Sequence, residues 1–442
     1  MKVVKRVVVP VLILLAGIIW FNYPKLNIIS GFAAKSMASN QFIAHRSMES
    51  VNANDHNVPM IKLAHAEAIK NGAMATVYGL MKRKAICNEG SGCVLINDDY
   101  DINAYQFTPH RTHTASNLPF PYGDAAPKDT VFDNVDYQQL NKAIDGAFAN
   151  AEIQKTRTVL VAYKNRIVGE KYIDGFTKDT PILGWSMTKS ILATLYGILE
   201  YEGKIDLKVP APIEDWQQDE RKNITLDHLL RMQSGLAWDE DYTAISDVTR
   251  MLFLDADMTL AQKEKEAIAA PTELWNYSSG TTNLLSGILR DRFETHQEYL
   301  DYPYKALIDR IGMNSMLIET DMKGNYVGSS YGWANTRDWA KFGLLYLNKG
   351  DWNGERLFDA SWVDYITTPT AFSKGTYGAH FWLNAEGEYP DVPKDLYSAN
   401  GYQGQYVFVI PSKELVVVRT GLAEDPEFDV NAFLSEVIKA IH

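Results

Sequence analysis

The chain has 442 residues, a formal net charge of -12, and a composition of 46% hydrophobic and 22% charged residues. This balance is typical of a globular protein and excludes extensive disorder, and the length allows two or three folded units. The negative charge, without any long run of lysine and arginine, argues against nucleic acid as a partner because phosphate backbones would be repelled.

The amino terminus combines basic residues with an apolar stretch. Lys2, Lys5 and Arg6 precede residues 7–24, which contain no charged side chain. A basic flank before such a stretch favours an amino end that stays in the cytoplasm while the following chain is exported. We therefore predict that residues 1–24 form a signal anchor that binds the membrane and holds the protein on the periplasmic side. A cleaved signal peptide is the alternative, and it would leave the protein secreted or periplasmic.

Residues 25–130 are predicted to form an extension wrapped on the main domain, and from residue 35 onwards the sequence is irregular. Cys87 and Cys93 flank Asn-Glu-Gly-Ser-Gly, whose glycines allow the chain to fold back on itself. In an exported protein a disulfide between them is the expected state, and two free thiols are the alternative.

Two histidines of this extension have a spacing that binds metal when it lies on a helix. His110 and His113 stand among loop-forming residues, however, and no clear third ligand accompanies them. We therefore predict no metal site, and the chemistry described below requires no cofactor.

Two strand hairpins lie towards opposite ends of the main domain, residues 131–442. Strands are predicted over residues 158–163, 167–173, 405–410 and 415–419, and helices over residues 137–148 and 430–441. The sequence between Ser186 and about Thr370 is mainly helical. We expect an α+β fold in which an antiparallel sheet, with its first and last strands together, is flanked by helices and carries an inserted helical lobe.

The segment Gly184-Trp-Ser-Met-Thr-Lys-Ser190 comes directly before a hydrophobic run that predicts a buried helix. Ser186 and Lys189 are three residues apart, so on a helix their side chains share a face. A lysine amine there can accept the serine proton, and the helix amino terminus can stabilise an oxyanion. We expect Lys189 to lie at the helix entrance and to contribute little to the core. The alternative is a helix-capping Ser186 beside a solvated Lys189.

Three motifs together resemble one family of enzymes. Ser186-Met-Thr-Lys189, Leu229-Leu-Arg-Met-Gln-Ser-Gly-Leu236 and Trp275-Asn-Tyr-Ser-Ser-Gly280 resemble the class C β-lactamase and penicillin-binding-protein-like serine hydrolases, with the 6-aminohexanoate-dimer hydrolase and esterase branch as the most similar. The resemblance extends from about Asp133 to the carboxyl terminus. It implies the β-lactamase/transpeptidase-like fold and an acyl-enzyme on Ser186, with water as the usual second substrate.

The resemblance also assigns roles to residues of the site. It identifies Tyr277 with the tyrosine of the family's Tyr-x-Asn motif, which relays protons, and it places Ser279 at the motif's third position, where we expect substrate contact. The family's Lys-Thr-Gly motif is replaced by Ala399-Asn-Gly401. This removes the lysine that attracts a substrate carboxylate in β-lactam-binding relatives, so uncharged acyl groups are favoured. The backbone after Gly401, at Tyr402, is the expected second oxyanion donor.

These observations predict a serine hydrolase that cleaves an ester or amide of a small molecule, with Lys189 and Tyr277 as general acid and base. The alternative is a catalytically silent penicillin-binding-like protein that binds cell-envelope peptides. The pair Asp227-His228 is reminiscent of a Ser-His-Asp triad, but it lies in a run that reads as a buried helix, which favours a structural histidine.

Overall fold

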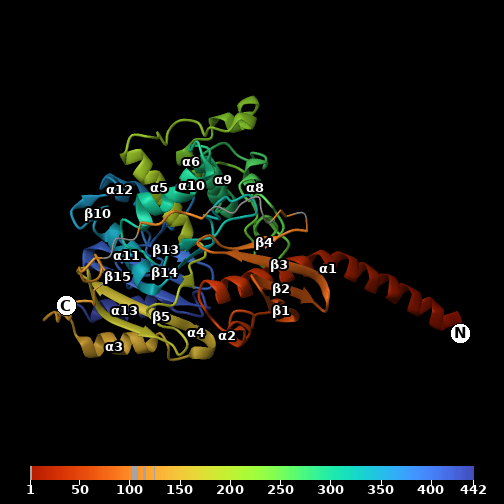
Figure 1. The fold of residues 1–442 in the computed structure, drawn as a ribbon, viewed down its shortest axis with the longest axis horizontal. Coiled ribbons are helices and arrows are strands. Elements are labelled where there is room, and N and C mark those ends of the chain that lie inside the picture. The colour runs from red at the N-terminus through yellow and green to blue at the C-terminus, as the bar shows by residue number, and fades with distance from the viewer. Residues whose placement is uncertain (1, 99, 102–107, 113–115, 124) are drawn as a thin grey trace. The chain divides into compact units, whose positions relative to one another are not determined.

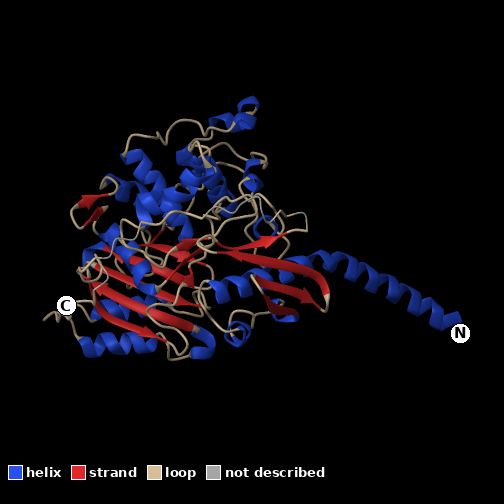
Figure 2. Cartoon of the chain, in the orientation of Figure 1, coloured by secondary structure: helices blue, strands red, loops and turns tan. Residues whose placement is uncertain are grey.

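The computed structural model describes residues 2–98, 100–101, 108–112, 116–123 and 125–442, and for residues 2–22 the backbone only. The elements are shown in Figures 1 and 2. The chain forms two compact units. Unit 1 consists of Met1–Gln106, Asp239–Asp257 and Asp321–Lys323, and unit 2 consists of Phe107–Trp238, Met258–Thr320 and Gly324–His442. The division of the sequence at residues 24 and 130 stays a prediction.

Unit 1 is built from a long helix and a four-stranded antiparallel sheet. Its elements are α1 (Lys2–Phe42), α2 (Met48–Ala53), η1 (Ile61–Leu63), β1 (Ala64–Ile69), β2 (Gly72–Val77), β3 (Leu80–Asn88), β4 (Gly92–Ile96) and α7 (Asp247–Phe253). The strands follow one another in the order β1-β2-β3-β4, and α1 packs on them through the fully buried Ala33, Ala34, Met37 and Ala38. Cys87 and Cys93 are register partners on β3 and β4 and are joined by a disulfide.

The expectation of irregular structure from residue 35 to residue 130 is wrong, because this stretch contains a complete sheet. Strands β1 and β2 are rich in alanine, which is a weak strand former, so local propensity does not reveal them. Their strand character comes from packing: Ala73, Ala75 and Val77 alternate along β2 and are all buried.

The predicted membrane-spanning segment finds no support in the structure. In the part of the chain whose side chains are described, no helix combines the length and the apolar character that crossing a bilayer requires.

Unit 2 is organised around a six-stranded antiparallel sheet in the order β12-β13-β14-β15-β5-β6. The strands are β5 (Thr156–Tyr163), β6 (Arg166–Tyr172), β12 (Trp382–Leu383), β13 (Tyr397–Gly401), β14 (Gln405–Ile410) and β15 (Leu415–Gly421). Strand β15 pairs with β5, so that Leu415 faces Tyr163. The prediction that the first and last strands of the domain come together is confirmed.

Helices cover both faces of this sheet. Helices α3 (Tyr137–Gly146) and α13 (Val430–Lys439) pack on one face around Leu140, Phe408 and Leu434. Helices α5 (Met187–Tyr201) and α11 (Thr336–Leu347) share the larger core on the other face. The predicted helices and strands of both ends are therefore confirmed, as is the α+β fold with flanking helices.

The inserted lobe between β7 and β12 is mainly helical, as predicted. The remaining elements of unit 2 are α4 (Ala151–Gln154), β7 (Ile182–Leu183), η2 (Glu214–Gln218), η3 (Glu220–Asn223), α6 (Leu226–Leu230), α8 (Leu260–Lys263), α9 (Ser279–Arg290), α10 (His296–Pro303), η4 (Tyr304–Ile308), β8 (Leu317–Ile318), β9 (Gly332–Ala334), β10 (Asp351–Trp352), β11 (Glu355–Arg356), α12 (Ser361–Thr367) and η5 (Pro411–Lys413). Strands β7, β9 and β8 form a small sheet beside the start of α5.

Candidate active site

A sharp turn places Ser186 directly before the first residue of α5. Trp185 has a φ of +46°, a left-handed conformation that is costly for a bulky residue and that persists only where the surroundings enforce it. A side chain at Gly184 would collide with the ring of Trp339, so the turn also needs a glycine there. Ser186 itself is half-buried, whereas the residues that follow it in α5 are buried. Ser186 is thus a partly accessible residue directly before a helix whose residues 187–199 are buried.

Lys189 lies one turn further along α5, and its amine has three oxygen neighbours. Its Nζ atom is 2.9 Å from Ser186 Oγ, 2.9 Å from Ser279 Oγ and 2.9 Å from the carbonyl oxygen of Ser329. Only 1% of the Lys189 side chain is exposed. The expectation that Lys189 contributes little to the core is therefore wrong, because the helix entrance is itself buried under α9 and the segment around Ser329.

Tyr277 lies beside the same amine. The centre of its ring is 4.9 Å from Lys189 Nζ, within the range of a cation–π contact. The rings of Tyr377 and Trp382 pack on it, with centroids 5.7 and 5.3 Å away. Tyr277 is half-buried, so its ring is held by aromatic packing while it keeps access to the site.

Ser279, the third residue of the Tyr-x-Asn-like motif, binds Lys189. It opens α9, its side chain is fully buried, and its hydroxyl oxygen accepts a hydrogen bond from the lysine amine. The Ser279 hydroxyl thus contacts Lys189, and the substrate contact expected for Ser279 stays a prediction. A serine is shorter than the asparagine of the motif, which fits this buried position.

The backbone around Gly401 packs against the turn that precedes Ser186. A side chain at Gly401 would collide with the carbonyl oxygen of Gly184, which shows how closely the two segments approach. The ring of Tyr402 meets that of Trp185 edge-on, with centroids 5.6 Å apart. Gly401 and Tyr402 therefore lie beside the segment that leads to Ser186, where the second oxyanion donor is expected.

Two buried polar side chains hold the turn between β13 and β14 in place. The sequence analysis did not select either of them. The Gln405 amide donates to the carbonyl oxygens of Tyr402 at 3.1 Å and Gly421 at 2.6 Å. Arg419 is fully buried and donates to the carbonyl oxygen of Gly404 at 2.7 Å. Burial lowers the pKa of Arg419 to about 9. The sequence signal for these two residues is a polar side chain in an otherwise apolar strand. Gln405 begins β14, and Arg419 lies near the end of β15.

A further buried layer lies behind Lys189. The side-chain oxygen of Asn283 accepts a hydrogen bond from the Ser329 N–H at 3.0 Å, which orients the carbonyl that faces the lysine. His380 is buried between α5, α6 and α9, and burial lowers its pKa to about 3. Neither residue was singled out by sequence reasoning, because each becomes significant only through contacts with distant segments.

The other histidines that the sequence analysis considered are His228, His110 and His113. His228 Nδ1 accepts from the Thr225 N–H at 3.2 Å as part of the cap of α6, in agreement with a structural histidine. His110 Nδ1 lies 3.2 Å from a carboxylate oxygen of Asp301. His113 lies outside the described residues.

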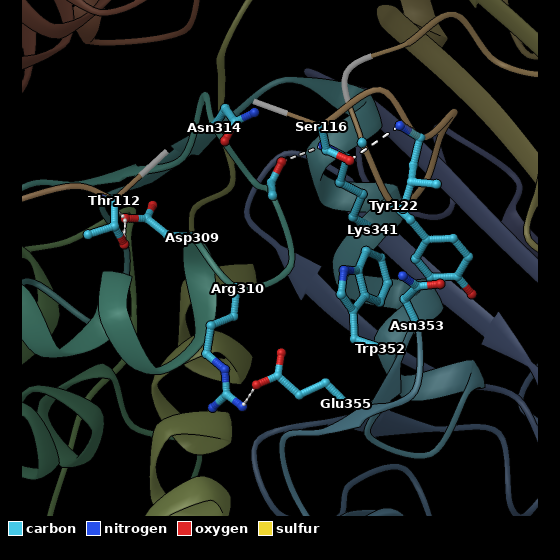
Figure 3. A pocket seen from close by; sticks show the side chains of 13 residues that line it. Thr112, Ser116, Tyr122, Asp309, Arg310, Asn314, Lys341, Trp352, Asn353 and Glu355 are labelled. Carbon is cyan, nitrogen blue, oxygen red and sulfur yellow. Dashed lines mark hydrogen bonds and ion pairs between the residues drawn. The ribbon is translucent and has the colours of Figure 1, made fainter. Parts of the chain in front are cut away.

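A separate cavity of about 440 Å³ in unit 2 shares no lining residue with the Ser186 site (Figure 3). Trp352 and Tyr122 form part of its wall, and Arg310 pairs with Glu355 at 2.6 Å. Lys341, on its floor, pairs with Asp338 at 2.9 Å. Each of these charged side chains thus has a partner of opposite sign.

Comparisons with known proteins identify the family of the chain. The sequence model of the Beta-lactamase family matches residues 139–432, more than half of the chain. A 6-aminohexanoate-dimer hydrolase from Paenarthrobacter ureafaciens is 22% identical over 306 residues, which cover 62% of this chain and 74% of that protein.

Solved structures show the same fold. A protein assigned as a 6-aminohexanoate-dimer hydrolase, from Bacillus anthracis, aligns with a TM-score of 0.58 and 20% identity over 70% of this chain and 85% of its own. A family VIII carboxylesterase aligns with a TM-score of 0.54 and 17% identity over 72% of this chain and 99% of its own. The resemblance inferred from the motifs is confirmed, and the chain belongs to the β-lactamase family.

Proposed function

We propose that this protein is a serine hydrolase that cleaves an ester or amide bond by forming an acyl-enzyme on Ser186. The observation that carries the proposal is the set of three oxygen atoms around Lys189 Nζ. A neutral amine has two N–H groups and one lone pair. In the neutral form, the lone pair of Lys189 Nζ can accept the proton of the Ser186 hydroxyl 2.9 Å away, while N–H groups of the amine bind oxygens such as Ser279 Oγ and the Ser329 carbonyl oxygen. This is the arrangement of a general base.

Acylation then follows from the neighbouring groups. Ser186 Oγ attacks the substrate carbonyl carbon while its proton passes to Lys189 Nζ. The backbone N–H groups of Ser186 and Tyr402 stabilise the negative oxygen of the tetrahedral intermediate. As the bond to the leaving group breaks, that group takes a proton from the Tyr277 hydroxyl, which is restored from Lys189.

Deacylation uses the same residues in reverse. A water molecule attacks the acyl carbon and gives a proton to Tyr277 or Lys189, the bond between the acyl group and Ser186 breaks, and Ser186 Oγ regains its proton. The catalytically silent alternative is not favoured, because a protein that only binds peptides does not need a buried lysine aimed at a serine. Burying an amine costs free energy, and this cost favours a functional reason for the position of Lys189.

The substrate we propose has an uncharged acyl group. Ala399 stands in place of the lysine that binds carboxylates in β-lactam-binding relatives, and its side chain is buried. The ring of Trp185, the residue before Ser186, contacts that of Tyr402, and the rings of Tyr277 and Trp382 pack together beside Lys189. The names of the relatives, an amide hydrolase and a carboxylesterase, support amides and esters as the two substrate classes.

We also propose that the protein is exported. The basic residues Lys2, Lys5 and Arg6 at the amino end support this, as does the Cys87–Cys93 disulfide, since such bonds persist in oxidising compartments.

A fluorophosphonate probe followed by peptide mapping tests the nucleophile. We expect a single adduct on Ser186, and no adduct after Ser186→Ala. A panel of chromogenic esters, short amides, linear oligoamides and a cephalosporin then tests the substrate class. Absence of labelling together with absence of turnover would reject the proposed function.

A further inference from the structure

We propose that His380 is a positioning residue for the base Lys189, acting through a set of buried hydrogen bonds that ties together the three helices around the site. The inference rests on the proposed function and names a residue outside the reacting groups. His380 lies in the loop that leads to β12, and the hydrogen bonds described below do not include Ser186.

Three hydrogen bonds connect His380 to three different helices. Its carbonyl oxygen accepts from the Ser190 hydroxyl of α5 at 2.7 Å. Its Nδ1 atom lies 2.6 Å from the carbonyl oxygen of Leu230 at the end of α6, and its Nε2 atom lies 3.0 Å from the Thr282 hydroxyl of α9. All of the side chains in these contacts are buried.

The partners determine the protonation state of the ring. A carbonyl oxygen can only accept, so Nδ1 carries the proton and donates it to Leu230. Nε2 then has a free lone pair and accepts from the Thr282 hydroxyl. The imidazole is therefore neutral. Burial lowers the pKa of His380 and disfavours a second proton, although the hydrogen bond to the Leu230 carbonyl acts in the opposite direction.

These bonds connect the residues that surround the base. Ser190 follows Lys189 on α5, and Thr282 lies one turn after Ser279 on α9. The bonds of His380 to Ser190 and Thr282, here called the His380 bridge, therefore connect the two helices. This bridge sets the spacing at which Lys189 Nζ lies 2.9 Å from Ser279 Oγ. A loss of the bridge would let the two helix ends separate without removing any group from the site.

His380 also lies in the segment that supports Tyr277. Tyr377 and Trp382, three residues before it and two after it, both pack on the Tyr277 ring. The His380 backbone has a φ of +60°, a left-handed conformation that an ordinary side chain adopts at a cost. The three hydrogen bonds hold the backbone in this conformation, and with it the two rings that fix Tyr277.

The test uses the full-length protein and separates the two side-chain bonds. Thr282→Val keeps the shape of the side chain and removes the donor to Nε2. His380→Asn places an amide nitrogen near the Nδ1 position and keeps the bond to Leu230, whereas His380→Gln can place an amide oxygen near Nε2 and keep the bond to Thr282. Thr281→Val is the matched control, because Thr281 is equally buried on the same helix and makes no side-chain bond to this bridge.

We expect Thr282→Val and His380→Asn each to lower kcat for a neutral ester by about 10- to 100-fold, the range for misplaced catalytic groups, with a much smaller change in KM. The double variant should lose no more than the worse single one, because both remove the same bond. His380→Gln should recover most of the activity. The pH dependence of Ser186 acylation should shift in the two defective variants and stay unchanged in Thr281→Val.

The proposal would be overturned by a wild-type acylation rate and pH profile in Thr282→Val and His380→Asn. It would equally be overturned if Thr281→Val lost as much kcat as Thr282→Val at the same melting temperature, since burial alone would then explain the loss. Failure of the proposed function looks different: the wild-type protein itself would then not be acylated at Ser186.

Discussion

Lys189 Nζ lies 2.9 Å from Ser186 Oγ, and the same atom lies 4.9 Å from the ring centre of Tyr277. The first distance joins two residues on one turn of α5, and the second joins that helix to the loop before α9. The amine therefore lies close both to Ser186, the proposed nucleophile, and to Tyr277, the residue that we propose to protonate the leaving group. Its ionisation state and its exact position are the properties that the following experiments examine.

Replacement of Lys189 by methionine should slow acylation of Ser186 by about 10²- to 10⁴-fold, the usual contribution of a general base. Methionine is chosen because Lys189 is buried, and alanine would leave a cavity. The rate of fluorophosphonate labelling measures the effect. Lys341→Met is the control, because Lys341 is also a buried lysine but lies on α11 and binds Asp338. An unchanged labelling rate in Lys189→Met would reject its role as the base.

Replacement of Tyr277 by phenylalanine should affect amides more than activated esters. An amine leaving group needs a proton, whereas a p-nitrophenolate does not, so we expect a loss of about 10²-fold or more for an anilide and a smaller one for a p-nitrophenyl ester. The ratio of the two kcat/KM values is the measurement. Trp382→Phe disturbs the ring that packs on Tyr277 but keeps the hydroxyl, and it should leave the ratio unchanged. Equal losses for both substrates would contradict the acid role.

Substrate charge should determine turnover. A buried carboxylate without a cationic partner costs several kcal/mol, and Ala399 supplies no such partner. We expect a neutral short-chain ester to exceed a matched ester with a terminal carboxylate in kcat/KM, and a cephalosporin to be turned over slowly or not at all. A tenfold preference for the carboxylated ester, about 1.4 kcal/mol in transition-state binding, would mean that another cation serves the site.

Acid should destabilise the folded protein through two buried histidines. Burial lowers the pKa of His380 to about 3 and that of His56 to about 4, both below the usual value of 6.5. The unfolded chain therefore binds more protons as the pH falls below about 6.5. Each histidine should cost about 1.4 kcal/mol of unfolding free energy per pH unit, down to about pH 4 for His56 and about pH 3 for His380.

Urea denaturation at a series of pH values between 7.5 and 4.5 measures this loss. His380→Gln and His56→Gln should each flatten the pH dependence of the unfolding free energy by about 1.4 kcal/mol per pH unit. A wild-type slope in both variants would show that other groups account for the acid sensitivity.

Export and oxidation should be observed together. A thiol assay on the denatured, unreduced protein should find no free thiol at Cys87 or Cys93, and protease added to intact spheroplasts should degrade the protein. Two free thiols combined with full protection from the protease would place the chain in the cytoplasm and reject the proposed export.

Local patterns in the sequence determined much of unit 2. The hairpins at 158–173 and 405–419 follow from runs of β-branched residues, and a helix after Ser186 follows from its apolar sequence, because both signals act between near neighbours. The shared face of Ser186 and Lys189 is likewise a property of one helical turn. Tyr277 was identified as a site residue because three short motifs of the chain resemble those of the family.

The tertiary structure alone decided what surrounds these residues. Ser279 and Ser329 lie 90 and 140 positions from Lys189 in the chain, yet they bind the same amine. No local sequence pattern marks His380, because its hydrogen-bond partners lie on three segments far away in the chain. They are the Ser190 hydroxyl, the Leu230 carbonyl oxygen and the Thr282 hydroxyl. The alanine-rich strands of unit 1 escaped detection since burial against α1, rather than propensity, makes them strands. Periodicity reports which face of an element is buried, whereas only the fold determines which groups meet there.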